Sequence, residues 1–546
     1  MKSFYDKVSQ ALENAIKDNY AEILEHPLWE LPQKQEFGDL SSMAALKLAS
    51  KLKKEPLEIA TQLKASLEKT LLADVERIEI LRPGFVNIFF SQEVLINSLN
   101  KILQDKDDFF RAKIKRRVLL EFLSANPTGP LSIAHGRQAV VGDTIGNILK
   151  FFGNDVVKEY YVNDAGKQMD LLVSSVQAWL QAPEGQEAKI PEGGYHGEYV
   201  KDIADEVLKN KDKLEKPNKL SLKEFIIEHI LNDFIKKDLN SLGIKFDSWI
   251  SQQKIIDKKE VEAAVEYLNE KGLIYEKQGA LWFSSTKFGD DKDRVIRKED
   301  GELTYFASDI AYHKDKIERK FTKLINLWGP DHHGYIKRVE SAISALPRRH
   351  AGALKHKKDI LKIIIIQLVT LKTKEKMSKR SGQMVLLSNL IRDVGKDTAR
   401  FYYLTRRNSS HLEFDIDLAK EMSFNNPLYY IQYVCARVES IFKKAKAPSF
   451  NSEFSKLLTN PEELNLLRTL LQFSYCLDKA YSTLEPIFII EYLRNLASAF
   501  HRFYEGTRVL TEDENITQAR LNLLQALKIV FHSGLGLLGI TPVEKM

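Results

Sequence analysis

The chain has 546 residues, of which 29% are charged and 44% hydrophobic, so it is too long for one domain and has the composition of a soluble globular protein. A formal net charge of +6 permits an RNA or another phosphate-rich partner without demonstrating one. Its two cysteines exclude a disulfide framework and a four-cysteine zinc site. With no apolar run near the roughly 18 residues of a membrane span, and no signal-peptide pattern, we expect a cytoplasmic protein.

Residues 1–110 are predicted to form a separate α+β module. Its apolar spacing predicts helices at 5–24, 40–53 and 56–71 and strands at 75–81 and 85–90. The charged run at 104–117 is interpreted as a solvated linker.

Residues 111–400 are predicted to form an α/β domain around a parallel, doubly wound sheet. Strand-like runs alternate with helical patterns, at 118–123, 156–162, 281–283, 324–328 and 361–369. The more charged segment 184–290 is interpreted as a mostly helical insertion. Residues 424–546 show almost only helical patterns and predict a closing helical bundle.

The stretch 121–143, EFLSANPTGPLSIAHGRQAVVGD, leads from a buried strand through a proline- and glycine-rich loop into a helix. With the strand that follows at 156–162, it predicts a right-handed parallel crossover unit. Ligands of such sheets bind at the carboxyl ends of the strands, and His135 stands at a helix start that favours an anion. The stretch is neither a dinucleotide fingerprint nor a P-loop.

Three further features have both a functional and a structural interpretation. Glu121 lies in an apolar strand, which is costly unless a cationic partner meets it or the strand is an edge facing water. The segment 374–382, KEKMSKRSG, could clamp a triphosphate or be a solvated basic loop. Tyr305 and Asp309 share a helix face that could receive a planar cation, or they mark a helix start with a stray acid. The adjacent His332 and His333 diverge too much to bind one ion, so no metal site is predicted.

Taken together, these stretches resemble the class I aminoacyl-tRNA synthetases, and specifically the arginyl-tRNA synthetase family. The HIGH signature corresponds to Ser132-Ile133-Ala134-His135, and the KMSKS signature to residues 376–380. The segments SANPTGPL, VNDAG, SDIAYHKDK, DHHGYIKRV, NNPLYYIQY and LGITPVEKM are also similar to this family, in family order along essentially the whole chain.

The resemblance implies an N-terminal tRNA-binding domain, a Rossmann-type catalytic domain with an insertion and an all-α anticodon-binding domain. It implies ATP-dependent activation of L-arginine to arginyl-adenylate and transfer to the 3′ end of tRNA(Arg), with Mg²⁺ accompanying ATP, and we expect a monomer. Two alternatives stay open: an RNA-binding relative that no longer activates arginine, and a class I enzyme for another amino acid.

The resemblance also implies roles for individual residues. The expected catalytic residues are Ser132, His135, Lys376 and Lys379. The expected ATP-binding residues are Pro127, Gly129, His135, Gly136, Met377, Ser378 and Lys379. The expected arginine-binding residues are Glu121, Asn126, Tyr305 and Asp309. The expected tRNA-binding residues are Asn87, Phe90 and Gln92, although Phe90 could equally be a core residue.

Two positions of the first signature depart from the family pattern. Ser132 stands where a histidine is usual, and Ala134 where a glycine is usual. Serine cannot carry a positive charge, so His135, Lys379 and Mg²⁺ are expected to contribute more to charge stabilisation here.

Overall fold

The structure is a computed structural model that describes residues 4–24, 28–32, 34–112, 114–183, 185–210, 214, 220–346, 360–372, 385–445 and 451–546. It divides into two compact units. The first comprises Met1–Ile114, Asn147–Gly153 and Leu418–Met546, and the second comprises Lys115–Gly146 and Asn154–Asp417. No helix in the described ranges is long and apolar enough to cross a membrane.

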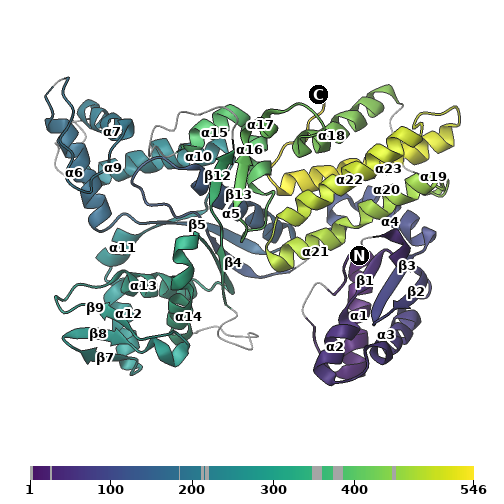
Figure 1. Ribbon diagram of the computed structural model, residues 1–546, viewed down its shortest axis with the longest axis horizontal. Coiled ribbons are helices and arrows are strands. Elements are labelled where there is room, and N and C mark those ends of the chain that lie inside the picture. Colours follow the sequence, from purple (N-terminus) through teal and green to yellow (C-terminus); the bar gives the residue numbers. More distant parts are fainter. Residues whose placement is uncertain are drawn as a thin grey trace. The chain divides into compact units, whose positions relative to one another are not determined.

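The N-terminal part of the first unit is an antiparallel sheet with strand order β1-β3-β2, accompanied by helices (Figure 1). The elements are α1 (Phe4–Tyr20), β1 (Leu40–Ser42), α2 (Ala44–Leu52), α3 (Pro56–Leu71), β2 (Val75–Leu81), β3 (Phe85–Phe90) and α4 (Gln92–Asp105). The predicted α3, β2 and β3 are confirmed. The helix expected at 40–53 is wrong at its start, because residues 40–42 pair with β3 as a strand. The expected linker is partly wrong as well, because Phe109 and Phe110 are buried.

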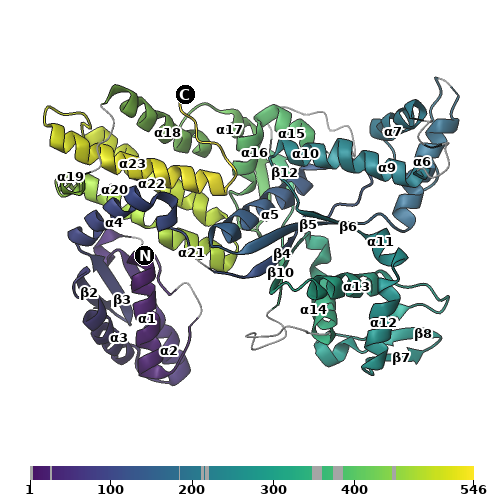
Figure 2. The same cartoon turned by 180° about the vertical axis from the view of Figure 1, so that it is seen from behind.

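The C-terminal part of the first unit is the predicted helical bundle (Figure 2). Its helices are α18 (Pro427–Lys444), α19 (Ser452–Ser455), α20 (Pro461–Leu471), α21 (Phe473–Thr483), α22 (Ile487–Gly506) and α23 (Glu514–Leu537). Helices α20 and α21 meet at Gln472. Leucine and phenylalanine side chains of these helices form its buried interior.

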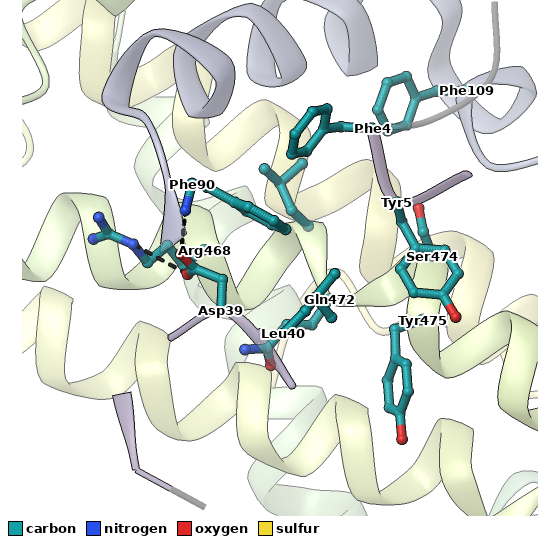
Figure 3. Close-up of a pocket in the computed structure, with 11 residues that line it drawn as sticks. Phe4, Tyr5, Asp39, Leu40, Phe90, Phe109, Arg468, Gln472, Ser474 and Tyr475 are labelled. Atoms are coloured by element: carbon teal, nitrogen blue, oxygen red, sulfur yellow. Dashed lines mark hydrogen bonds and ion pairs between the residues drawn. The ribbon is translucent and has the colours of Figure 1, made fainter. Parts of the chain in front are cut away.

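Within this unit, Asp39 joins the N-terminal sheet to the bundle. Its carboxylate accepts the Phe90 backbone N–H at 2.7 Å and pairs with Arg468 at 3.3 Å. The Phe90 ring packs edge-on against Phe4, with centroids 4.9 Å apart, beside a cavity of about 20 Å³ (Figure 3). Such a volume accommodates about one water molecule, so this cavity is a packing defect rather than a ligand site.

The second unit is built on a parallel sheet of five described strands in the order β11-β10-β4-β5-β6. These are β4 (Arg117–Glu121), β5 (Asp155–Val162), β6 (Ser248–Ser251), β10 (Lys323–Trp328) and β11 (Leu361–Ile365). The predicted parallel sheet is therefore confirmed, with β4 at its centre. The strand expected at 281–283 is confirmed as β8 (Ala280–Phe283), but its expected place in the parallel sheet is wrong, because it belongs to a separate antiparallel sheet with strand order β7-β8-β9. The segment expected as a helical insertion also supplies β6 to the main sheet.

The remaining strands of this unit are β7 (Ile274–Lys277), β8 (Ala280–Phe283), β9 (Arg294–Arg297), β12 (Val369–Lys372) and β13 (Leu412–Asp415). Its helices are α5 (Ile133–Phe151), α6 (Lys167–Gln181), α7 (Glu198–Lys209), α9 (Leu222–His229), α10 (Lys236–Ser241), α11 (Gln252–Asp257), α12 (Glu260–Glu270), α13 (Tyr305–Glu318), α14 (Ile336–Ala345), α15 (Leu387–Val394), α16 (Lys396–Tyr403) and α17 (Ile416–Lys420), which crosses the unit boundary. Helix α13 lies between α12 and α14 (Figures 1 and 2).

The predicted unit β4–α5–β5 is confirmed, and the first half of its helix is tightly packed. A Cβ on Gly142 would come within 2.2 Å of the Phe122 ring, and one on Gly136 within 2.6 Å of the Tyr403 hydroxyl. The fully buried Arg137 donates hydrogen bonds to the backbone carbonyls of Gln367, Arg407 and Ser410 at 2.8–2.9 Å. These contacts fix the position of the helix start that carries His135.

Candidate active site

A cavity of about 680 Å³ lies in the second unit, at the carboxyl ends of β4, β5 and β10. This is the edge at which parallel sheets bind their ligands. Five of the predicted site residues line it: Glu121, Asn126, His135, Tyr305 and Asp309. The structure thus brings five side chains that are distant in the sequence to one cavity wall.

Glu121 lies on the central strand and is 6% exposed, which excludes the alternative that it faces water at a sheet edge. Its carboxylate forms an ion pair with the fully buried Lys316 of α13. The same carboxylate accepts the Ser124 hydroxyl at 3.3 Å, and Lys316 also donates to Asn326 Oδ1 at 3.3 Å. The charge of Glu121 is therefore compensated within the protein before any ligand binds.

A neutral histidine connects this ion pair to Asp309. Burial lowers the pKa of His313 to about 3, so its imidazole is uncharged near neutrality. Its Nδ1 lies 2.8 Å from the Asp309 carbonyl oxygen, and its Nε2 lies 3.2 Å from Asn326 Nδ2. The amide N–H donates to Nε2, so Nδ1 carries the hydrogen and donates to the carbonyl. These bonds hold α13 in register with β10.

Asp309 is the carboxylate best placed to receive a cation. Tyr305 begins α13 and Asp309 follows one turn later, so the predicted shared face is confirmed. Burial raises the pKa of Asp309 to about 6, opposed by a hydrogen bond of 2.5 Å from the Tyr335 hydroxyl and reinforced by the nearby Glu121. The Asp309 partner is a phenol rather than a cation, so its ionised form adds a negative charge to the cavity wall.

His135 lines the same cavity, near the start of α5. The Ser132 backbone N–H points at His135 Nδ1 over 3.1 Å, and the Ser132 hydroxyl lies 3.2 Å from the same atom. A backbone N–H can only donate, so Nδ1 accepts and Nε2 carries the hydrogen. Burial lowers the pKa of His135, which favours the neutral ring. Nε2–H is therefore available as a donor to an anion.

The remaining predicted ligand-binding residues are placed as follows. Asn126 is exposed at the cavity and donates to Gln168 Oε1 at 2.7 Å. Pro127 is buried and Gly129 partly buried in the loop before α5. Lys376, Met377, Ser378 and Lys379 lie outside the described residues.

The three predicted tRNA-contacting residues lie in the first unit. Asn87 is buried in β3, and Phe90 is 8% exposed, as the core interpretation of Phe90 expected. Gln92 is exposed and donates to the Leu458 carbonyl at 3.2 Å. Of the three, Gln92 alone presents an exposed side chain.

Sequence reasoning missed Lys316, Tyr335, Tyr161 and Gln252, which complete or line the cavity wall. Lys316 follows Asp309 by two helical turns, and this spacing on one helix face could have revealed it. The others carry no local signal, because their neighbourhood depends on contacts between distant segments.

Comparison with known proteins places the whole chain in one family. Residues 3–90 match the family model of the arginyl tRNA synthetase N terminal domain, residues 98–412 the catalytic domain of tRNA synthetases class I (R), and residues 431–546 the DALR anticodon binding domain. The arginine–tRNA ligase of Carboxydothermus hydrogenoformans is 39% identical over 97% of each chain. The chain belongs to the arginyl-tRNA synthetase family. The arginine–tRNA ligase of Thermotoga petrophila is likewise 39% identical, over 99% of each chain.

The fold agrees with that membership. The solved structure of the Thermus thermophilus arginyl-tRNA synthetase superposes with a TM-score of 0.78 over 99% of this chain and 100% of that chain, at 20% identity. The resemblance to this family predicted a catalytic domain built on a parallel sheet with helices, and the second unit has this architecture. Across the described ranges, no three His, Cys, Asp or Glu side chains come together as metal ligands.

Proposed function

We propose that this arginyl-tRNA synthetase activates L-arginine with ATP in the 680 Å³ cavity and then transfers the arginyl group to the 3′ end of tRNA(Arg). The observation that supports this proposal is that one cavity contains both groups suited to bind a cation and groups suited to bind an anion. Asp309 and Tyr305 offer a cation-accepting wall, and the helix start at His135 offers N–H donors to an anion. Arginine and ATP present those two charges.

On the arginine side, the guanidinium binds the Asp309 carboxylate, with the exposed Tyr305 over it. Glu121 shapes the floor of the subsite through its bond to Lys316, and its negative charge is already shared. Asn126 holds the α-amino end of the substrate. Asp309 supplies the negative charge that a guanidinium requires. A substrate with a neutral or acidic side chain would leave the Asp309 carboxylate unpaired, so the site rejects it.

On the ATP side, His135 Nε2–H donates to the phosphates, and the backbone at Pro127, Gly129 and Gly136 shapes the nucleotide subsite. Lys376 and Lys379, with Met377 and Ser378 between them, close over the triphosphate. An α-carboxylate oxygen of arginine attacks the α-phosphorus, and the bond to the β-phosphate oxygen breaks as pyrophosphate leaves. Donors that meet the charge developing on the phosphates stabilise this transition state. Mg²⁺ enters with ATP as its counter-ion.

In the second step, a hydroxyl of the terminal tRNA ribose attacks the arginyl carbonyl carbon, and AMP leaves with the bonding electron pair. We assign residues 1–110, with the exposed Gln92, and the bundle at 424–546 to tRNA binding, and residues 111–400 to catalysis; the buried Asn87 and Phe90 support the fold of the first of these segments. We further propose that the enzyme acts as a monomer in the cytoplasm.

Arginine-dependent exchange of pyrophosphate into ATP, run with and without tRNA(Arg), tests this function. We expect exchange when intact tRNA is present. An RNA-binding relative, the alternative suggested by Ser132 and Ala134, would bind tRNA and show no exchange. An enzyme for another amino acid would show exchange with that amino acid and none with arginine.

The affinity for arginine is expected to fall in acid. Because guanidinium binds the ionised Asp309 and burial raises its pKa to about 6, protonation below that pH removes the charge that binds the ligand. The kcat/KM for arginine should therefore decrease about tenfold per pH unit below about 6. Initial rates from about pH 5 to about pH 8 check this. Asp309→Asn should lose this acidic limb, and an unchanged profile in that variant would contradict the assignment.

Removing the Ser132 hydroxyl is expected to have a small effect. In Ser132→Ala, His135 Nδ1 keeps the backbone N–H at 3.1 Å and loses only the hydroxyl at 3.2 Å. We expect kcat to fall about 2- to 10-fold, as for one hydrogen bond of moderate strength. Single-turnover formation of arginyl-adenylate measures it, and a loss of about a thousandfold would show that serine acts on the phosphates directly.

A further inference from the structure

Two polar atoms in the cavity wall are buried and have no hydrogen-bond partner in the part of the chain that the structure describes. They are the Tyr161 hydroxyl and Gln252 Oε1. The side chains are 6% and 4% exposed, and both line the cavity that contains Asp309. An unpaired buried polar atom costs free energy, so in a binding site the ligand is expected to pair with it.

Both residues lie where neighbouring parallel strands end. Tyr161 is the penultimate residue of β5 and pairs in register with Ile250 of β6. Gln252 directly follows Ser251, the last residue of β6, and begins α11. Their position at the carboxyl ends of β5 and β6 is the one from which parallel sheets contact ligands.

The segment that carries Gln252 is held firmly. Asp164 accepts the Ser251 hydroxyl at 2.6 Å and the Gln253 backbone N–H at 2.9 Å, one bond on each side of Gln252. Helix α11 also packs against α13, which carries Asp309. The unpaired oxygen of Gln252 therefore belongs to an ordered wall rather than to a loose loop.

Tyr161 is also fixed, and its phenol lies close to the carboxylates of Asp309 and Glu121. Its ring stacks on Tyr312 with centroids 4.2 Å apart, and its backbone N–H donates to Ser124 at 3.1 Å. Burial raises the pKa of the Tyr161 phenol, and the nearby Asp309 and Glu121 raise it further. The phenol therefore stays protonated, and its oxygen lone pairs remain available to a donor.

A count of donors and acceptors shows why such atoms are needed. A guanidinium carries five N–H donors. One oxygen of Asp309 already accepts from Tyr335, and the Glu121 carboxylate already accepts from Lys316 and Ser124. Asp309 alone therefore keeps about three free lone pairs, fewer than the five N–H groups of arginine, and the Glu121 carboxylate is shared with Lys316 in a buried ion pair.

We propose that Tyr161 and Gln252 form the neutral side of the guanidinium subsite, accepting the N–H groups that Asp309 leaves unpaired. This inference rests on the proposed binding of arginine in this cavity. Neutral acceptors satisfy the ligand without a further buried negative charge, which would be costly in the empty enzyme. The two residues thus contribute to selection for a planar, multi-donor cation.

Calorimetric titration of the full chain with arginine, alone and with tRNA(Arg), tests this inference. Gln252→Leu is expected to raise the Kd for arginine about tenfold or more, and Tyr161→Phe to raise it by a smaller factor. The Kd for ATP should not change. The melting temperature of the free Gln252→Leu protein should be equal or higher, because the substitution removes an unpaired buried acceptor.

The matched control is Gln253→Leu, since that side chain bonds to the exposed Asp257 and does not line the cavity. It should leave the Kd for arginine unchanged, and Gln252→Glu, which keeps an acceptor, should retain binding. If both Gln252→Leu and Tyr161→Phe bind arginine within about twofold of the wild type, the inference is overturned. Absence of arginine binding to the wild type would also overturn it. Wild-type binding without pyrophosphate exchange would instead overturn only the proposed reaction.

Discussion

Replacing Asp309 by asparagine is expected to raise the KM for arginine by about 150-fold or more, the equivalent of about 3 kcal/mol. Asparagine keeps the shape of the side chain and can still accept the Tyr335 hydroxyl, which lies 2.5 Å from the carboxylate. It lacks the negative charge, and Lys316 already compensates the neighbouring Glu121. The guanidinium would then bind beside a wall that has no uncompensated negative charge, so no ionic attraction would offset the cost of removing the guanidinium from water.

Pyrophosphate exchange in the presence of tRNA measures this effect, with arginine and ATP varied separately. The KM for ATP should change little, because Asp309 lies at the arginine end. Asp315→Asn is the control: this aspartate lies on the same helix, pairs with Arg319 at 2.9 Å and does not line the cavity. A KM for arginine that is unchanged in Asp309→Asn would exclude guanidinium as the ligand of this residue.

Replacing Lys316 by methionine is expected to lower the free energy of unfolding of the second unit by about 3–5 kcal/mol. The ammonium is fully buried, and its removal leaves the buried carboxylate of Glu121 without its ionic partner. Methionine fills similar space, so the loss reflects the stranded charge rather than a cavity. Urea denaturation, monitored by intrinsic fluorescence, measures the change.

A double substitution distinguishes the contribution of the Lys316–Glu121 ion pair to stability from the contribution of side-chain packing. Lys316→Met with Glu121→Gln removes both charges and should recover most of the lost stability, because the stranded charge is gone. Lys314→Met is the matched control, since Lys314 pairs at 3.0 Å with the exposed Glu318 on the same helix and should cost at most about 1 kcal/mol. If the double variant is no more stable than Lys316→Met, the ion pair is not the cause.

Features that depend on neighbouring residues could be predicted from the sequence. The crossover β4–α5–β5 followed from an apolar run, a proline- and glycine-rich loop and helical spacing, all within about 45 residues. The shared face of Tyr305 and Asp309 followed from helical periodicity in the same way. Family resemblance then supplied the roles that spacing alone left open.

Features that depend on distant residues could not. The run at 281–283 has the pattern of any short buried strand. The sheet to which it belongs depends on the strands with which it pairs, and the local sequence does not specify them. The strand β6, SWIS, has no clear period and sits at the edge of the main sheet. Lys316 is 195 residues from Glu121, so the sequence around Glu121 does not indicate that Lys316 is its ionic partner. The unpaired atoms of Tyr161 and Gln252 are visible only once the wall is assembled.

The three hydrogen bonds from Arg137 to distant carbonyls can all form only late in the synthesis of the chain. The farthest acceptor, Ser410, follows Arg137 by 273 residues. At roughly 5–20 residues per second, the ribosome adds that acceptor about 14 to 55 seconds after the arginine. Until then, the guanidinium at the start of α5 cannot reach all three of its final acceptors. The nucleotide end of the site is therefore completed only after most of the catalytic segment has been translated, and a nascent chain halted before that point carries an unfinished site.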